Sequence, residues 1–147
     1  MNYPRWWNTT ITLYNRYEEK ETNLVTWRKT IIDGCFLKNA NNKVSVGQTV
    51  LETNEILVRI PESDKFKPYG EMISDVKNLT GDYFTLNRGD IIIKGAVDDD
   101  IDEYAKGKKS TDLLSKYKEI GVCLQINNWQ DNTGVGRVAP HYYVSGE

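Results

Sequence analysis

Histidine is nearly absent from this chain: His141 is the only one among 147 residues. Nucleophilic catalysis by serine or cysteine usually takes a histidine as its base, so a single candidate of that type remains. Its setting in "APHYYVSG" is typical of a strand residue beside aromatic side chains. The sequence also lacks a glycine-rich phosphate-binding loop. We therefore predict no catalytic residues and do not expect an enzyme.

Cysteine is also scarce, because only Cys35 and Cys123 are present and they do not form a CxxC motif. Apolar neighbours surround both, which is typical of buried free thiols. No apolar run reaches the length of a membrane span, and "MNYPRWWNTT" lacks the apolar core of a signal peptide. We expect a soluble protein made in a cytosol, without a membrane partner.

A strong charge of one sign is missing too. The chain has 19 basic and 21 acidic residues and a net charge of −2, which gives no broad basic surface for nucleic acid. The hydrophobic content is 39%, whereas the aromatic content of 11% is generous. This composition favours cross-strand aromatic pairs and contact surfaces over an aliphatic helical core.

Alternation of apolar and polar residues, the pattern of β-strands, runs through most of the chain. Gly34, inside the second alternating segment, predicts a bend or bulge. "NANN" predicts a turn, and "RGD" is interpreted as the turn that opens a strand. The predicted strands lie in "TTITLYNRY", "LVTWRKTIIDGCFLK", "KVSVGQT", "NEILVRIP", "YFTLN", "DIIIKGAV", "GVCLQINNW" and "RVAPHYYVSG".

One helix is predicted, over residues 110–119, where Ser110 or Thr111 can cap an apolar stripe. Residues 62–82 show weak periodicity and are predicted to form a long loop that docks on something. Together these patterns predict a single β-rich domain over residues 1–147. Its fold class is mainly β, a small antiparallel barrel or sandwich of seven or eight strands with one short helix and one long loop.

The acidic residues after "DIIIKG" are candidates for a special surface: Asp98, Asp99, Asp100 and Asp102. They do not match a calcium-binding loop, which needs a glycine at its sixth position and a terminal glutamate. Nor do neighbouring acids in one loop provide the opposed carboxylates of a glycosidase. We therefore expect no metal and no cofactor. The segment is interpreted as the solvated exit of a buried strand.

Large aromatic residues are the candidates for partner contacts. Trp6 and Trp7 are adjacent near the start of the chain, where they could anchor an interface or cap one open end of a barrel. Phe66, Tyr69 and Met72 of the long loop complete the predicted contact set.

The order of motifs along the chain resembles that of a family of short proteins encoded in the virion-structure modules of tailed phages of Gram-positive hosts. The resemblance rests on "TITLYNRY", "TWRKTIIDGCFL", "ILVRIP", "GDIIIKGAVDD" and "APHYYVSG". Tyr142 and Tyr143 stand where the family pattern has a Trp-Lys type pair, so no role is transferred to that position.

The resemblance implies a non-enzymatic head–tail connector or head-closure subunit, assembled as a homo-oligomeric ring at the portal–tail junction. Its partners would be portal, adaptor and tail proteins. As the alternative to a solvated strand exit, Asp98, Asp99, Asp100 and Asp102 would line the channel near packaged DNA. The protein would be made in the bacterial cytoplasm and reside in the virion. A minor capsid or tail-completion protein, or a phage-encoded host-directed binding factor, are the alternatives.

Overall fold

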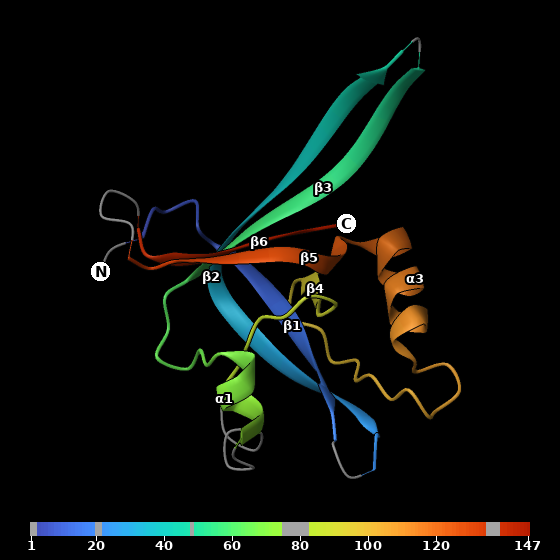
Figure 1. Ribbon diagram of the computed structural model, residues 1–147. Coiled ribbons are helices and arrows are strands. Elements are labelled where there is room, and N and C mark those ends of the chain that lie inside the picture. Colours follow the sequence, from blue (N-terminus) through green and yellow to red (C-terminus); the bar gives the residue numbers. More distant parts are fainter. Residues whose placement is uncertain (1–2, 20–21, 48, 75–82, 135–138) are drawn as a thin grey trace.

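The computed structural model describes residues 3–19, 22–47, 49–74, 83–134 and 139–147. Within them are the strands β1 (Thr9–Glu18), β2 (Val25–Val46), β3 (Thr49–Pro61), β4 (Ile91–Lys94), β5 (Cys123–Asn132) and β6 (His141–Gly146). The helices are α1 (Tyr69–Ser74) and α3 (Ser110–Ile120). All strand pairings are antiparallel, and the order β1-β2-β3-β6-β5-β4 closes into a barrel (Figure 1).

The predicted mainly β class and the barrel are confirmed, but the described strands number six, fewer than the seven or eight expected. The turn predicted at "NANN" is wrong, because Asn39–Asn42 lie inside β2. Asparagine tolerates turns without requiring them, and here the ladder with β3 prevails over that preference. The chain reverses instead after Val46, where Gly47 adopts a positive φ of 63°.

Two of the eight predicted strands are not separate strands in the structure: the one at "KVSVGQT" is largely part of β2, and the segment "YFTLN" does not form a strand. It contributes only one isolated bridge, between Phe84 and Phe66. Its backbone is hydrogen-bonded to Asn15 of β1 and to Asp90 at the entry of β4, so it crosses one end of the barrel as a buried connection.

Gly34 marks a bulge, as predicted. The pairing of β2 with β1 slips between the pairs Thr9–Cys35 and Ile11–Ile32, and Gly34 has a φ of 74°. Before this point β2 pairs with β1, and from Phe36 onward it pairs with β3. The bulge therefore allows one long strand to pair with β1 in one sheet and with β3 in the other.

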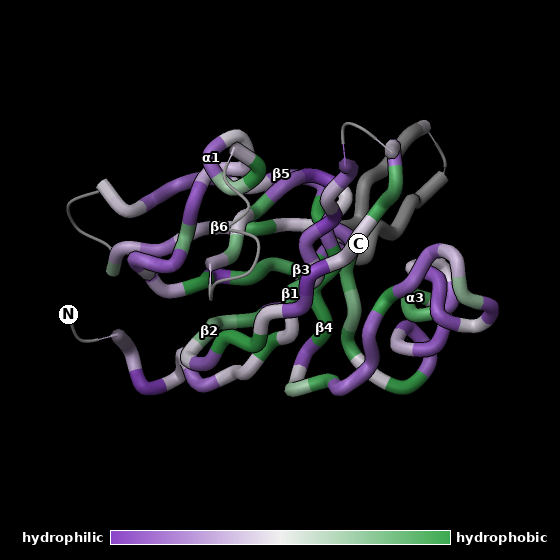
Figure 2. The backbone as a smooth tube through the Cα atoms, turned by 90° about the horizontal axis from the view of Figure 1, so that it is seen from below, coloured by the Kyte–Doolittle hydropathy of each residue, from purple (hydrophilic) through white to green (hydrophobic). Residues whose placement is uncertain are grey.

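The barrel interior is a continuous apolar core. Figure 2 shows hydrophobic residues concentrated along the barrel strands. Cys35 is buried here, and burial raises the pKa of its thiol to about 12. With Cys123 it confirms the prediction of buried free thiols. The core residues are Ile11, Leu13, Cys35, Val58, Ile60, Phe84, Leu86, Ile92, Leu124, Ile126, Tyr142 and Val144.

A second apolar cluster lies outside the barrel, between β1, β4 and α3. It buries the outer face of β1. There Thr12 donates to the carbonyl of Gly95 at 2.7 Å and accepts from the amide of Val97 at 3.0 Å. Helix α3 agrees with the predicted helix at 110–119 to within one residue. The cluster consists of Tyr14, Ile91, Ile93, Val97, Ile101, Leu113 and Cys123.

The long loop predicted for residues 62–82 contains a helix, α1, that was not expected. Met72 on α1 is fully buried, and the short run "YGEMIS" gave too little periodicity to reveal a six-residue helix. The last part of the predicted loop, residues 75–82, lies outside the described residues.

An extended arm projects from the barrel (Figure 1). The ladder between β2 and β3 continues for seven pairs from Ala40–Glu55 to Val46–Thr49. No third strand joins it in the described part of the chain, because β1 pairs with β2 only up to Cys35 and β6 pairs with β3 only from Ile56. At about 3.3 Å per residue, the arm is about 23 Å long.

Candidate interaction surfaces

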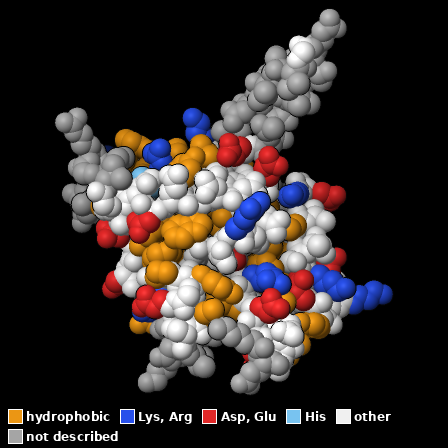
Figure 3. Space-filling view, in the orientation of Figure 1, with side chains coloured by type: hydrophobic (Ala, Val, Ile, Leu, Met, Phe, Trp, Pro, Cys, Tyr) orange, Lys and Arg blue, Asp and Glu red, His pale blue; other side chains and the backbone are white. Residues whose placement is uncertain are grey.

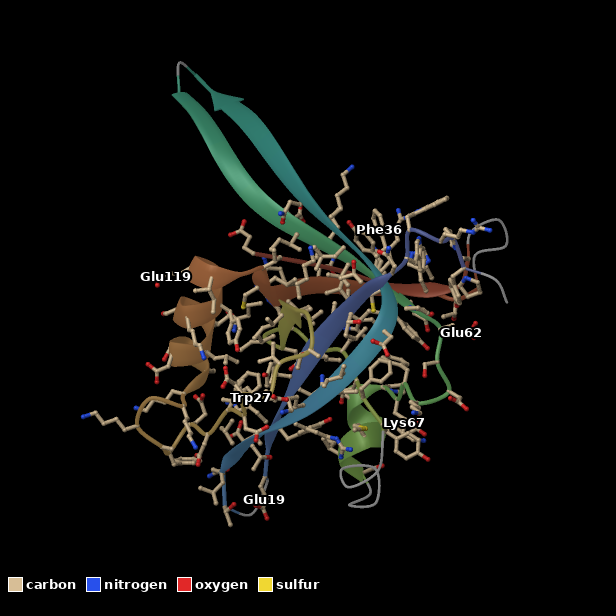
Figure 4. All side chains as sticks on the ribbon, turned by 180° about the vertical axis from the view of Figure 1, so that it is seen from behind. Glu19, Trp27, Phe36, Glu62, Lys67 and Glu119 are labelled. Atoms are coloured by element: carbon tan, nitrogen blue, oxygen red, sulfur yellow. The ribbon has the colours of Figure 1, made fainter. Side chains whose placement is uncertain are left out.

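The two N-terminal tryptophans have different environments. Trp7 is buried, stacked on Tyr3 at 5.2 Å between ring centroids and edge-on to His141 at 5.7 Å. Phe36, labelled in Figure 4 near the point where the arm leaves the barrel, also lies beside it at 6.4 Å. Trp7 therefore covers an end of the barrel, whereas Trp6 is 66% exposed and available for a contact.

His141 lies in β6 among these aromatic rings, as its sequence context predicted. Its Nδ1 atom is 2.7 Å from the carbonyl of Ala139, and its Nε2 atom is 3.4 Å from the side-chain amide of Asn132. The first distance fits an N–H donated by Nδ1, which leaves Nε2 to accept. Both ring nitrogens have a structural partner within the chain.

The candidate contacts from the long loop pack inward. Phe66 stacks on Tyr142 at 4.3 Å and meets Trp129 edge-on at 5.8 Å. Tyr69 stacks on Tyr17 at 6.1 Å, and Met72 is fully buried. Of the five predicted contact residues, Trp7 and Met72 thus offer no side chain to a partner in this structure.

The acidic segment is fastened to the barrel and to α3. Asp99 accepts hydrogen bonds from the Tyr117 hydroxyl at 2.5 Å and the Lys116 ammonium at 3.0 Å. Its backbone carbonyl accepts from the Tyr14 hydroxyl at 2.6 Å. The Tyr117 hydrogen bond, followed by that of Lys116, holds the pKa of the Asp99 carboxyl below its usual range.

Lys29 of β2 holds the two neighbours of Asp99. Its ammonium donates to the carbonyl of Asp98 at 3.0 Å and lies 3.2 Å from the Asp100 carboxylate. Asp102 closes a turn by accepting from the amide of Tyr104 at 2.9 Å.

A hollow of about 270 Å³ lies between this segment and α3, lined by acids and by Lys108, Lys109 and Lys116. The space-filling view likewise shows blue and red side chains side by side below the arm (Figure 3). The segment is therefore a surface of both signs rather than the uniformly acidic one that the sequence suggested. Within the described ranges, no three His, Cys, Asp or Glu residues are grouped so that they could hold a metal ion.

The acid that organises the structure is Asp90, which sequence reasoning treated only as part of a turn. Its carboxylate is 1% exposed and accepts three hydrogen bonds: from the Asn15 side chain at 2.8 Å, the Arg16 amide at 3.0 Å and the Asn87 amide at 3.0 Å. Asn15 also donates to the carbonyl of Thr85 at 2.7 Å. These bonds join β1 to the buried crossing segment and to the start of β4.

Burial makes Asp90 sensitive to pH. Loss of hydration raises the pKa of its carboxyl to about 6, against the lowering effect of the three N–H donors. Because the folded-state pKa lies above the unfolded one, the contribution to stability is complete below the unfolded pKa and is lost as pH rises through about 6. We expect the free energy of unfolding to rise by about 1 kcal/mol from this group between about pH 7.5 and pH 5.

NMR titration of the Asp90 side-chain carboxyl carbon tests this expectation directly. A midpoint near the ordinary aspartate pKa of about 4 would contradict it.

Comparison with known proteins identifies one family. The model described as "Family of unknown function (DUF6751)" matches residues 6–147. No curated protein and no solved structure matches the chain. Among the helices that the structure describes, none is long and apolar enough to cross a membrane.

Proposed function

Because the chain belongs to the DUF6751 family, whose function is unknown, we propose a role from its structure: it is a non-enzymatic structural subunit that assembles with copies of itself. In its specific form, the proposal makes it a head–tail connector or head-closure subunit of a tailed-phage virion. The copies form a ring at the portal–tail junction, between portal or adaptor and tail proteins.

The projecting arm is the observation that supports assembly of the chain with copies of itself. A two-stranded hairpin is marginally stable in water unless a third strand or another surface supports it. Seven residue pairs of the arm, Ala40–Glu55 to Val46–Thr49, lie beyond the reach of β1 and β6. A partner that covers the arm would supply the support that the described part of the subunit does not.

The virion part of the proposal is supported by the sequence resemblance. Its two best motifs correspond to structural units: "GDIIIKGAVDD" is the Gly89 turn, β4 and the start of the acidic segment, and "APHYYVSG" is β6 with its entry. Both units help to close the barrel. The role in the virion is inferred from this resemblance of sequence.

The proposal gives the acidic segment a role in such a ring. Asp99 and Asp100 are bound to lysines, whereas Asp98 and Asp102 are exposed. If this side of the subunit faces the channel, its paired charges of both signs present no strongly basic patch to the phosphates of packaged DNA, which can pass without strong contacts.

Cryo-electron microscopy of purified virions of the encoding phage, with mass spectrometry of the same particles, tests the proposal. We expect peptides of this chain in the particle and a ring of its barrels between portal and tail. Density for the chain elsewhere in the capsid or tail would favour a minor capsid or tail-completion protein. Absence of its peptides from the particle would refute a structural role and favour a host-directed factor.

A further inference from the structure

The first half of β2 has an open edge. Between Val25 and Asp33 the strand pairs with β1 on one side, and β3 joins the other side only from Phe36 onward. No described strand occupies the side opposite β1 over these residues. The open stretch is about 30 Å long at about 3.3 Å per residue.

The hydrogen-bond pattern of β1 identifies which β2 residues face this edge. The amide of Arg16 binds the Asp90 carboxylate, and the carbonyl of Thr10 binds the amide of Gly95, so these even-numbered residues of β1 point away from β2. In an antiparallel ladder, the residues opposite them also point outward. The outward-facing residues of β2 are therefore Val25, Trp27, Lys29 and Ile31, the register partners of Glu18, Arg16, Tyr14 and Thr12. The amide of Val25 already donates to the Tyr104 hydroxyl at 2.9 Å, so the part of the edge available to a new strand begins at Trp27.

Hollows and apolar side chains follow the same edge. One hollow of about 480 Å³ is lined by residues 28–33 and by two other segments, through Ser63 and Lys65 of one and Phe84 of the other. A second, of about 430 Å³, lies around residues 26–29, Tyr17 and Asp100. Three large hydrophobic side chains are also exposed on or beside the edge: Leu24, Ile31 and Tyr104.

An open edge of this length with exposed apolar side chains is a site for strand addition. The arm is a strand donor of matching dimensions, since its seven residue pairs span about 23 Å. The arm and the open edge lie at opposite ends of β2, and they diverge from the barrel, the arm to the upper right and the open stretch to the lower right of Figure 1. An arm therefore cannot reach the edge of its own subunit, and the contact has to join different copies.

The charges favour β3, rather than β2, as the strand of the arm that pairs with the open edge of another copy. Residues 49–54 contain Glu52 and no basic residue, which gives a formal charge of −1. At the acceptor edge Lys29 is already paired with Asp100, and the other basic side chains there are Arg28 and, in the adjoining hollow, Lys65. Opposite charges on paired strands stabilise a ladder, whereas two acidic strands would repel each other.

We propose that the strand Thr49–Glu55 of one copy adds to the open β2 edge, residues 27–33, of the next copy. The donor and acceptor surfaces differ, so the contact is heterologous and propagates head to tail into a ring or filament. This inference rests on the proposed assembly function and specifies its interface.

Two variants remove the two halves of this contact separately. Ile31→Pro blocks the acceptor, because it deletes an outward-facing N–H while the ladder with β1 keeps its bonds. Ile31→Thr is its matched control, since it retains the N–H and a β-branched side chain. Replacement of residues 41–54 by Asn-Gly removes the donor and leaves a tight hairpin turn between Ala40 and Glu55.

Sedimentation velocity of the full chain and its variants measures the result, with circular dichroism to verify that each barrel is folded. We expect the wild type and Ile31→Thr to self-associate as concentration rises. Ile31→Pro alone and the arm-shortened chain alone should stay monomeric. Their equimolar mixture should form a heterodimer and nothing larger, because it contains one intact arm and one intact edge.

Three outcomes would overturn the inference. A wild type that stays monomeric up to about 1 mM excludes the contact between copies. Self-association of folded Ile31→Pro at wild-type strength shows that the β2 edge is not the acceptor. A mixture that remains monomeric shows that the arm and edge do not bind each other. The ring in virions can still be present in each case, so the proposed function is tested independently.

Discussion

Replacement of Gly146 by alanine is expected to lower the free energy of unfolding by about 3 kcal/mol, at the upper end for an overpacked site. A Cβ atom at this position would collide with the backbone oxygen of Gln125 and lie 2.8 Å from Cδ1 of Leu124. Backbone atoms cannot rotate away as a side chain does. The Gln125 amide is moreover fixed by a 2.9 Å bond to the carbonyl of Glu147.

The position explains the size of the effect. Gly146 is the last residue of β6 and is the register partner of both Ile56 on β3 and Ile126 on β5. A shift of β6 to relieve the collision would disturb two ladders of the closed barrel at once.

Gly70→Ala is the matched control. Gly70 lies in α1, has open space where a Cβ would be placed and does not have a positive φ. Alanine is the better helix former, so this variant should keep or raise the stability by up to about 1 kcal/mol. Urea unfolding followed by tryptophan fluorescence compares the two. Equal midpoints for Gly146→Ala and the wild type would show that the strands separate at little cost.

The barrel could be predicted because local patterns and tertiary pairing agree over most of the chain. The alternation in "TTITLYNRY" became β1, and Gly34 became the bulge at which β2 changes partners. The predictions failed where a long-range ladder prevailed over a local preference. The four residues "NANN" carry a turn signal, yet the register with Ile56–Thr53 keeps them extended, which merges two expected strands into β2.

The candidate sites were less predictable, because the sequence does not show which charges meet. The run from Asp98 to Asp102 stood out by composition, whereas its neutralisation depends on Lys29 and Lys116, far away in the sequence. The sequence likewise gives no reason why Trp6 and Trp7 should differ. In the structure Trp7 is buried because it stacks on Tyr3 and covers the barrel end, whereas Trp6 is exposed. The open edge of β2 could not be foreseen, because it exists only where β1 and β3 overlap incompletely.

Asp90 did leave a signal that could have been used. A single acid directly before three isoleucines is costly to bury unless donors surround it, and the preceding "LNRG" has the composition of a turn whose amides point inward. The composition predicts the turn, but it does not show that the Asp90 side chain enters the core.

Substitution of Asp90 by asparagine should lower the free energy of unfolding by about 3 kcal/mol. Three N–H donors converge on the carboxylate, two of them on Oδ2 and one on Oδ1. Either orientation of an asparagine amide places its NH₂ group against at least one of these N–H donors. That donor is then buried without an acceptor. A protonated carboxyl differs, because both of its oxygens can still accept.

Asp64→Asn is the control, since it makes the same chemical change at an exposed aspartate and should alter stability by less than about 0.5 kcal/mol. Urea unfolding at about pH 7 and about pH 5 separates the two effects of Asp90. The rise in stability on acidification should shrink in Asp90→Asn, which has no carboxyl to protonate, and persist in Asp64→Asn. A stable Asp90→Asn with wild-type pH dependence would mean that the carboxylate neither holds the crossing segment to β1 nor titrates near neutral pH. The Asn15–Thr85 bond alone would then suffice to close that end of the barrel.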